Sequence, residues 1–376
     1  MEETLRYWVG FNLVRGVGPV RLRRLLQVFG DVASAWTATE AALRASGLDE
    51  RALRNLLKVR AQVDLDQVLQ KAMDLGVRIL TWESPEYPTL LAQLPDAPPV
   101  LYLRGECLQE DEWTVAVVGT RKASAYGQQV AYRLVSELAS NGLTIVSGLA
   151  RGIDSIAHRA AIEAGGRTIA VLGSGVDHIY PPEHRGLAQA ITEHGALVSD
   201  YPLGTRPEAS NFPPRNRIIS GLSLATIVIE AGLRSGALIT ADFALDQGRE
   251  VFAVPGSILS PSSAGCNRLL RDGAHVLTEA RDVFEVLHLG QVEEKRAAQM
   301  ALPKTPTERA VFAQLSTDPQ HVDDLARATE LPAATVSGAL VLMELKGLVR
   351  QVGPLTYVRA FEPPGQYQVS DSLDPV

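Results

Sequence analysis

Between Trp113 and Gly256 the chain alternates short apolar runs with glycine-containing turns and helical stretches. The apolar runs span residues 115–118, 143–146, 168–172, 196–198, 225–229 and 251–254. Runs that are apolar throughout are typical of strands buried on both faces, as in a parallel sheet covered by helices. The pattern therefore predicts an α/β fold with an extended Rossmann-like, doubly wound sheet, which we assign to residues 79–290. The proline-rich stretch 83–104 is expected to lie against this sheet as an extended lead-in.

Four loops of this region combine small residues with arginine: Gly119-Thr-Arg121-Lys-Ala-Ser124, Ser147-Gly-Leu-Ala-Arg151-Gly-Ile-Asp154, Pro213-Pro-Arg215-Asn216-Arg217 and Arg234-Ser235-Gly236-Ala237. Three of them follow a predicted strand, and ligands of open α/β sheets bind at the carboxyl ends of the strands. A guanidinium can chelate a phosphate, and the first N–H groups of a helix attract anions. The loops therefore predict a site for a ligand with several phosphates, contacted by Arg121, Ser124, Ser147, Gly148, Arg151, Asn216, Arg217, Ser235 and Gly236. The alternative for each arginine is an ion pair with a neighbouring carboxylate.

Motifs of catalysis and metal binding are weak in this sequence. Asp154 and His158 lie four residues apart on one predicted helix, where they could form half of a metal site, an acid–base dyad or a structural hydrogen bond. No third ligand follows at the spacing of a metal site, which favours the structural hydrogen bond. The chain has no Gly-x4-Gly-Lys-Ser/Thr motif and no Gly-x-Ser-x-Gly motif. We predict no catalytic residue, no metal and no cofactor, although Glu230 beside a phosphate loop must either orient an arginine or perform chemistry.

The first 78 residues predict a separate helical domain of the helix-hairpin-helix or SAM-like kind. The turn Arg15-Gly16-Val17-Gly18-Pro19 separates two amphipathic stretches, and Ser46-Gly47-Leu48-Asp49 looks like a degenerate second copy. Such a turn can present the backbone N–H groups of Gly16 and Gly18 to a phosphate of duplex DNA. Residues 15–60 carry nine Lys/Arg against four Asp/Glu, a net charge of +5. An ordinary helical cap domain explains the same pattern equally well.

The C-terminal part predicts a small second domain. Residues 291–305 suit a linker, residues 306–359 predict three helices and a hairpin, as in a winged helix-turn-helix, and residues 360–376 have the composition of a disordered tail. The segment 306–359 carries five Lys/Arg against six Asp/Glu, a net charge of −1. This balance favours contact with another protein over contact with DNA.

Composition limits the remaining classes of function. The net charge is −7 and 46% of the residues are hydrophobic, so anion binding must come from local clusters of cations and the chain can bury a sizeable core. Only Cys107 and Cys266 are present, which argues against a disulfide framework and for the cytoplasm. No run is long enough to predict a membrane span.

Taken together, the motifs Gly119-Thr-Arg121, Ser147 to Asp154, Phe212-Pro-Pro-Arg-Asn-Arg217 and Ser235-Gly-Ala-Leu-Ile-Thr-Ala241 resemble the DNA-processing protein A (DprA, also called Smf) family over about residues 80–285. The resemblance implies a cytoplasmic bacterial protein of natural transformation that binds incoming single-stranded DNA, protects it and helps to load the RecA recombinase. It also implies a homodimer without catalytic turnover. Some relatives carry a lysine after the Tyr-Pro of the third loop, where this chain has Pro182; Arg185 is the nearest cation here.

Two other functions stay open from the residues alone. Nucleotide phosphoribohydrolases of a related Rossmann group use a Pro-Gly-Gly-x-Gly-Thr-x-x-Glu loop where this chain has Glu230-Ala-Gly-Leu-Arg-Ser-Gly-Ala237, so the loss of that loop counts against an enzyme. A transcription regulator acting through residues 306–359 is the second alternative, and the charge of that segment counts against it.

Overall fold

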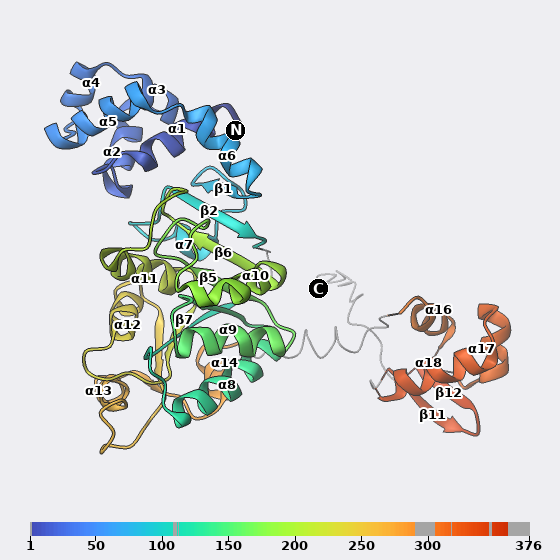
Figure 1. Ribbon diagram of the computed structural model, residues 1–376. Helices are drawn as coiled ribbons and strands as arrows, with labels where there is room; N and C mark the ends of the chain where they lie inside the picture. Colours follow the sequence, from blue (N-terminus) through green and yellow to red (C-terminus); the bar gives the residue numbers. More distant parts are fainter. Residues whose placement is uncertain are drawn as a thin grey trace, which may run out of the picture. The chain divides into compact units, whose positions relative to one another are not determined.

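The computed structural model describes residues 2–107, 111, 113–289, 305–316, 318–345 and 348–359. The chain divides into two compact units, residues 1–287 and residues 288–376 (Figure 1). The linker predicted at 291–305, apart from Thr305, and the tail predicted at 360–376 lie outside the described residues. Within the described ranges, no helix is long and apolar enough to cross a membrane.

The first unit contains the predicted sheet. Over the part of the chain that is described it has nine strands in the order β1-β2-β6-β5-β4-β3-β7-β8-β9. Neighbours from β6 to β9 pair in parallel, whereas β1 and β2 form an antiparallel edge. The strands are β1 (Arg78–Thr81), β2 (Val100–Gly105), β3 (Thr114–Val118), β4 (Thr144–Ser147), β5 (Thr168–Val171), β6 (Gly195–Ser199), β7 (Ala225–Val228), β8 (Glu250–Ala253) and β9 (His275–Val276).

The proline-rich stretch 83–104 does more than lead into the sheet. Its last residues form β2, which pairs with β6 in the register Arg104↔Leu197. Pro99 is the last proline before this strand, so every residue from Val100 onward has an N–H group to pair. The expectation of an extended lead-in was therefore incomplete, because composition alone does not say which extended segments find a partner strand.

Helices cover both faces of the sheet, as a doubly wound fold requires (Figure 1). One face is covered by α7 (Thr89–Ala92), α11 (Phe212–Gly221), α12 (Gly236–Asp246) and α13 (Ala264–Arg271), and the other by α8 (Ala125–Ser140), α9 (Ile153–Glu163), α10 (Arg185–His194) and α14 (Ala280–Val286). The chain starts the parallel sheet at β3, proceeds to β6 on one side and then returns to β7 on the other. The switch point between β3 and β7 is where such folds bind ligands.

The N-terminal helices share a core with the sheet. They are α1 (Glu2–Leu13), α2 (Pro19–Phe29), α3 (Val32–Thr37), α4 (Glu40–Ala45), α5 (Glu50–Gln62) and α6 (Leu65–Asp74). Trp8 and Phe11 of α1 belong to the same buried cluster as Val100 and Tyr102 of β2. The Tyr102 hydroxyl donates to Asn12 Oδ1 at 3.1 Å. The helical region is thus docked on β2, and the boundary predicted at residue 78 falls inside one compact unit.

The second unit forms a winged helix with its own core. It contains α16 (Pro306–Gln314), β10 (Gln320–His321), α17 (Val322–Thr329), α18 (Ala333–Leu345), β11 (Val349–Gly353) and β12 (Thr356–Arg359). The three strands pair in the order β10-β12-β11. Val311, Leu325, Leu340 and Met343 are buried against one another. The predicted helices and hairpin of residues 306–359 are confirmed.

Because Tyr102 joins the helical region to the sheet, we expect its truncation to destabilise the whole first unit. Replacing Tyr102 by alanine should lower the free energy of unfolding by about 3 to 5 kcal/mol, whereas phenylalanine, which loses only the hydroxyl bond to Asn12, should cost about 1 kcal/mol. Urea unfolding followed by tryptophan fluorescence measures both changes. Separate melting of the helical region, with the sheet unaffected, would contradict the shared core.

Candidate nucleic-acid interface

The four arginine-containing loops converge on one cavity of about 770 Å³ at the carboxyl ends of β3 and β7. Of the predicted contacts, four line this cavity: Arg121, Asn216, Ser235 and Gly236. Arg234 lines it as well. We call this space the mouth of the sheet. Its place agrees with the switch point of the strand order, where ligands of open α/β sheets bind.

Two cations of the mouth are free. The exposed side chains of Arg121 and Arg234 form no ion pair or hydrogen bond with any residue that the structure describes. The Arg121 guanidinium instead lies 5.5 Å from the centre of the Phe212 ring, and the ring of Tyr180 lies 5.8 Å from that of Phe212. Phe212 and Arg234 belong to the loop motifs, but the sequence did not predict that they contact the ligand. Their convergence depends on loops that are far apart along the chain. The mouth thus combines free guanidinium groups with aromatic rings.

Glu230 organises the Arg121 loop. Its buried carboxylate accepts a hydrogen bond from the backbone N–H of Ser124 at 2.9 Å and another from the Ser262 hydroxyl at 2.5 Å. Ser124 in turn caps α8, since its hydroxyl oxygen accepts from the Gly127 N–H at 3.1 Å. Ser124 therefore supports the loop and does not line the mouth. Glu230 was expected to orient an arginine or to perform chemistry; its carboxylate contacts no arginine among the described residues and instead holds the backbone of the Arg121 loop.

Arg215 forms the floor of the mouth. Its buried guanidinium donates to the carbonyl oxygen of Gly148 at 2.7 Å and to that of Val171. A side chain at residue 148 would collide with this group, because a Cβ atom there would lie 2.6 Å from a guanidinium nitrogen. Burial lowers the pKa of Arg215 to about 10, with the nearby Asp154 acting in the opposite direction.

Ser147 and Gly148 face the interior, which corrects the expectation that they face the ligand. The Ser147 hydroxyl is fully buried and donates to the Val117 carbonyl oxygen at 2.6 Å, joining β4 to β3. The Gly148 N–H donates to Asp154 Oδ2 at 3.2 Å. These donors are occupied by the protein itself.

Arg151 and Arg217 follow the ion-pair alternative. Arg151 lies 2.6 Å from Glu183 Oε1, and Arg217 lies 3.1 Å from Asp200 and 3.5 Å from Asp96. Neither side chain lines the mouth. Successive residues of a helix point about 100° apart, so Asn216 can face the mouth while Arg217 on the same helix turns away. Arg151 and Arg217 thus lie in ion pairs outside the mouth, and their contact with a ligand stays a prediction.

The other predicted contacts lie elsewhere in the first unit. Arg185 lines a separate groove together with Arg104. Gly16 and Gly18 form the turn before α2, with Gly16 at φ +102° and Gly18 capping α2 without any side-chain bond. The second hairpin differs, because the Asp49 carboxylate accepts the N–H groups of the first turn of α5. Only the first hairpin leaves a helix N-terminus open to an anion.

Asp154 and His158 do not form a dyad. Asp154 accepts the N–H groups of Gly148 and Ala150 at 3.2 and 3.3 Å, while His158 Nδ1 pairs with the Thr168 hydroxyl at 2.7 Å. Burial raises the pKa of Asp154, although Arg215 opposes this shift. The predicted hydrogen bond between Asp154 and His158 is therefore not formed, and each residue instead has its own structural partners, with Thr168 as the partner of the imidazole. In the described ranges, no three His, Cys, Asp or Glu side chains form a metal-binding group.

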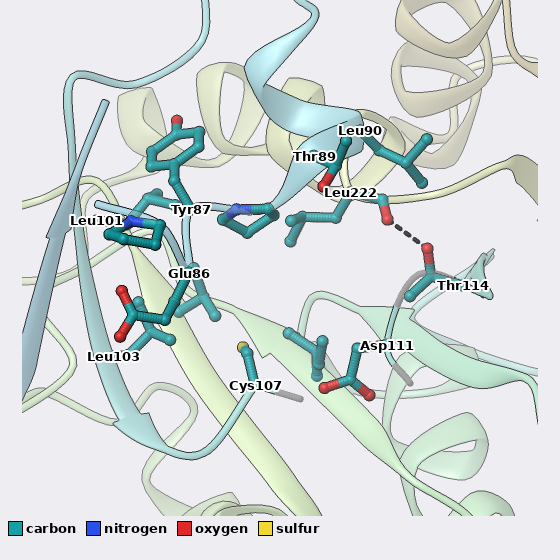
Figure 2. Close-up of a pocket in the computed structure, with 14 residues that line it drawn as sticks. Glu86, Tyr87, Thr89, Leu90, Leu101, Leu103, Cys107, Asp111, Thr114 and Leu222 are labelled. Atoms are coloured by element: carbon teal, nitrogen blue, oxygen red, sulfur yellow. Dashed lines mark hydrogen bonds between the residues drawn. The ribbon is translucent and has the colours of Figure 1, made fainter. Parts of the chain in front are cut away.

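A second, apolar cavity of about 330 Å³ lies toward the amino ends of β3 and β7, whereas the mouth lies at their carboxyl ends (Figure 2). Leu101, Leu103 and Leu222 line it, and the Cys107 sulfur points into it. Burial raises the pKa of the Cys107 thiol to about 12, so the thiol stays protonated at neutral pH. Asp111 at its rim is held by Arg167 at 2.9 Å. The apolar side chains and the protonated Cys107 thiol therefore suit this cavity to contacts with an apolar group more than to nucleophilic attack by the thiol.

The buried His158 predicts a pH-dependent stability. Burial, with smaller effects of His184 and Arg215, lowers its pKa from 6.5 to about 3. The unfolded chain therefore takes up this proton first as the pH falls, and stability is lost progressively between pH 6.5 and 3. From pH 7 to pH 5 the loss due to this group should be about 2 kcal/mol. Urea unfolding of His158→Gln should show a pH dependence smaller by that amount, and equal dependences would contradict a neutral imidazole.

Comparison with known proteins gives one family match for the sheet domain and one for the winged helix. The family described as DNA recombination-mediator protein A matches residues 78–288, and the DprA winged helix domain matches residues 295–353. Protein Smf of Synechocystis sp. is 35% identical over 390 residues, which cover 94% of this chain and 98% of the relative.

Two solved structures extend the comparison. DNA processing protein A from Streptococcus pneumoniae superposes with a TM-score of 0.67 at 35% identity and covers 74% of this chain and 97% of its own. DNA processing protein A from Helicobacter pylori, described by its single-stranded DNA binding mode, has a TM-score of 0.51 at 31% identity and covers 57% of this chain and 96% of its own. With its four loop motifs at one mouth and both domains matched, this chain belongs to the DNA recombination-mediator protein A (DprA/Smf) family.

Proposed function

We propose that this chain binds single-stranded DNA at the mouth of the sheet and acts as a recombination mediator without catalytic turnover. The observation that carries the proposal is the pair of free guanidinium groups, Arg121 and Arg234, beside the rings of Phe212 and Tyr180. Residues 106–290 carry 15 Lys/Arg against 20 Asp/Glu, so the domain as a whole does not attract an anion and binding must come from local groups of cations such as this pair. The single-strand binding described for the Helicobacter pylori relative supports the same ligand.

The combination of groups favours a single strand over a duplex. Arg121 and Arg234 can chelate backbone phosphates, and the exposed Gly236 at the start of α12 brings a helix N-terminus to the same mouth. Phe212 offers a ring on which a base can stack. A base exposes its ring face only when it is unpaired, because a duplex buries that face between neighbouring pairs. The mouth therefore suits a flexible strand that brings phosphates and unstacked bases together.

Binding without chemistry is part of the proposal. A phosphoribohydrolase-like enzyme would need a carboxylate that reaches the ligand. Glu230 is the carboxylate of the segment 230–237, where those enzymes have their characteristic loop. Both of its oxygens are used, one by the Ser124 N–H and the other by the Ser262 hydroxyl. The carboxylate is buried and does not line the mouth. These contacts favour a positioning role in a binding protein.

The remaining parts of the proposal concern partners. We propose that the chain protects incoming DNA during natural transformation, passes the strand to a RecA-type recombinase and self-associates to a homodimer, in line with the family's description as a recombination mediator. Gly16 and Gly18 at the open hairpin are proposed to contact duplex DNA. The winged helix is proposed as a protein-contact module, since Val341 and Leu342 on α18 are about half exposed.

The central test is the salt dependence of binding. If the mouth and its surroundings neutralise about four phosphates, the log-log slope of affinity against salt should be near −3, and affinity for a single strand should fall about fiftyfold between 50 and 200 mM salt. Arg121→Gln and Arg234→Gln should each weaken binding by about 1 to 3 kcal/mol for all base sequences alike. Fluorescence anisotropy with labelled oligonucleotides measures both quantities.

Arg159→Gln is the matched control, because it removes one charge from an exposed position on α9 outside the mouth. It should bind as the wild type does. Arg217→Gln should reduce stability more than affinity, since its guanidinium is held by Asp200 and Asp96. Normal binding by Arg121→Gln, or a flat salt dependence of the wild type, would refute the proposal.

A second test concerns the winged helix, which has its own core and a net charge of −1 over residues 306–359. A DNA-reading winged helix brings cations to the phosphates beside the groove. The isolated segment 305–359 should therefore show no measurable affinity for duplex DNA at physiological salt. Its removal should leave single-strand affinity unchanged and alter self-association or recombinase binding in analytical ultracentrifugation. Tight, salt-sensitive duplex binding by the segment would support the transcription-regulator alternative instead.

A further inference from the structure

A groove of about 340 Å³ lies between the first turns of α10 and the end of strand β2. Arg104 enters it from β2, directly opposite Leu197 of β6. Arg185 and Gln189 lie one turn apart on α10 and share one side of that helix. His178 closes the groove from the loop that follows β5. None of these four residues lines the mouth of the sheet.

The groove has uncompensated positive charge. Arg104 and Arg185 are exposed and form no ion pair or hydrogen bond with any residue in the described ranges. Asp177 supplies the only carboxylate among the lining residues, and its two oxygens accept the Gly204 N–H at 3.0 and 2.9 Å. Several other arginines of the domain, such as Arg151, Arg167 and Arg217, are paired with a carboxylate, whereas the two guanidinium groups of this groove have no such partner in the described residues and can bind an anion. The imidazole of His178 adds a further hydrogen-bonding group, and the Gln189 amide, which donates to Glu193 Oε1 at 3.3 Å, has a second N–H to offer.

We infer that this groove is a second phosphate site, which binds the backbone of the same DNA strand that the mouth holds. The inference rests on the proposed function. Its structural basis is a shared wall: the loop from Asp177 to Arg185 contributes Tyr180 to the mouth and His178 and Ile179 to the groove. A strand that leaves the mouth past Tyr180 meets Arg185 and Arg104 on the other side of this loop.

Arg104 lies next to the core that joins the sheet to α1. Alternate residues of a strand lie on one face of the sheet, so Val100, Tyr102 and Arg104 share a face. Val100 and Tyr102 pack in the core that includes α1, and Arg104 comes next, at the point where the helical region ends. Residues 15–60 of that region carry a net charge of +5. The groove therefore adjoins the part of the sheet on which the basic helical region is docked.

The test uses the double variant Arg104→Gln/Arg185→Gln in the full chain and two oligonucleotides, one of about 5 nucleotides and one of about 20 nucleotides. The short strand occupies the mouth alone. Affinity for the long strand should fall about tenfold, and its log-log salt slope should become shallower by about 1.4, as expected for two lost phosphate contacts on a single strand. Affinity for the short strand should stay unchanged.

Three further variants of the chain serve as controls for this test. Arg133→Gln/Arg159→Gln removes the same charge from exposed positions of α8 and α9 and should bind both strands as the wild type does. Arg121→Gln should weaken both lengths, which tests the mouth separately. Arg104→Lys/Arg185→Lys keeps the charge and should keep the salt slope, so the test holds even if the glutamine variant fails to fold.

Two outcomes would overturn the inference. If Arg104→Gln/Arg185→Gln and Arg104→Lys/Arg185→Lys bind the long strand like the wild type while Arg121→Gln binds weakly, the groove is no part of the DNA path, although the proposed function stands. If calorimetric titration with inorganic pyrophosphate shows binding that only the Arg104→Gln/Arg185→Gln variant loses, with DNA binding intact, the groove serves a free phosphate ligand. A wild type that fails to bind either oligonucleotide refutes the proposed function itself.

Discussion

The buried guanidinium of Arg215 is the interaction on which the mouth depends. It takes the carbonyl oxygens of Gly148 and Val171 as partners, and Asp154 lies close enough to influence its pKa. A buried charge without such partners is strongly unfavourable. The chain must therefore bring the start of α11, the loop after β4 and the end of β5 together around one side chain. This arrangement sets the floor of the mouth, and it leaves ligand binding to other residues.

The arginines of the domain divide into two groups according to their neighbours. Arg217 is held by Asp200 and Asp96, and Arg151 is held by Glu183, whereas Arg121 and Arg234 have no such partner in the described residues. The acidic surplus of the domain thus neutralises many of its cations. Among the guanidinium groups without such a partner, Arg121 and Arg234 lie together at one cavity where the strands end. Local charge, and not net charge, decides where this chain can hold an anion.

Carboxylates act here by shaping loops. Glu230 joins the Ser124 N–H to the Ser262 hydroxyl, so one buried group fixes the loop after β3 relative to the segment before α13. Asp154 holds the turn after β4 by accepting two of its N–H groups. Both residues sit beside cations and could pass for catalytic acids in a sequence. Their hydrogen bonds point to rigid loops, which present the free arginines in a constant geometry.

The sequence alone determined the sheet, its helices, the winged helix and the position of the mouth. The apolar runs predict buried strands, and ligands meet such sheets at the carboxyl ends of the strands. It also placed Arg121, Asn216, Ser235 and Gly236 correctly at one cavity. The reason is that these residues lie next to the ends of strands or helices, and the local sequence pattern indicates where such an end lies.

The tertiary structure alone decided which polar groups are free. Arg217 is bound by Asp96, 121 residues earlier in the chain, and Ser147 by the carbonyl of a neighbouring strand. The pairing of Phe212 with Tyr180, and of Arg104 with Arg185, likewise joins distant segments. No local pattern encodes such partners, because a side chain's partner depends on how segments far apart in the sequence pack. An arginine in a loop motif is therefore a ligand contact or a structural ion pair only once the fold has formed.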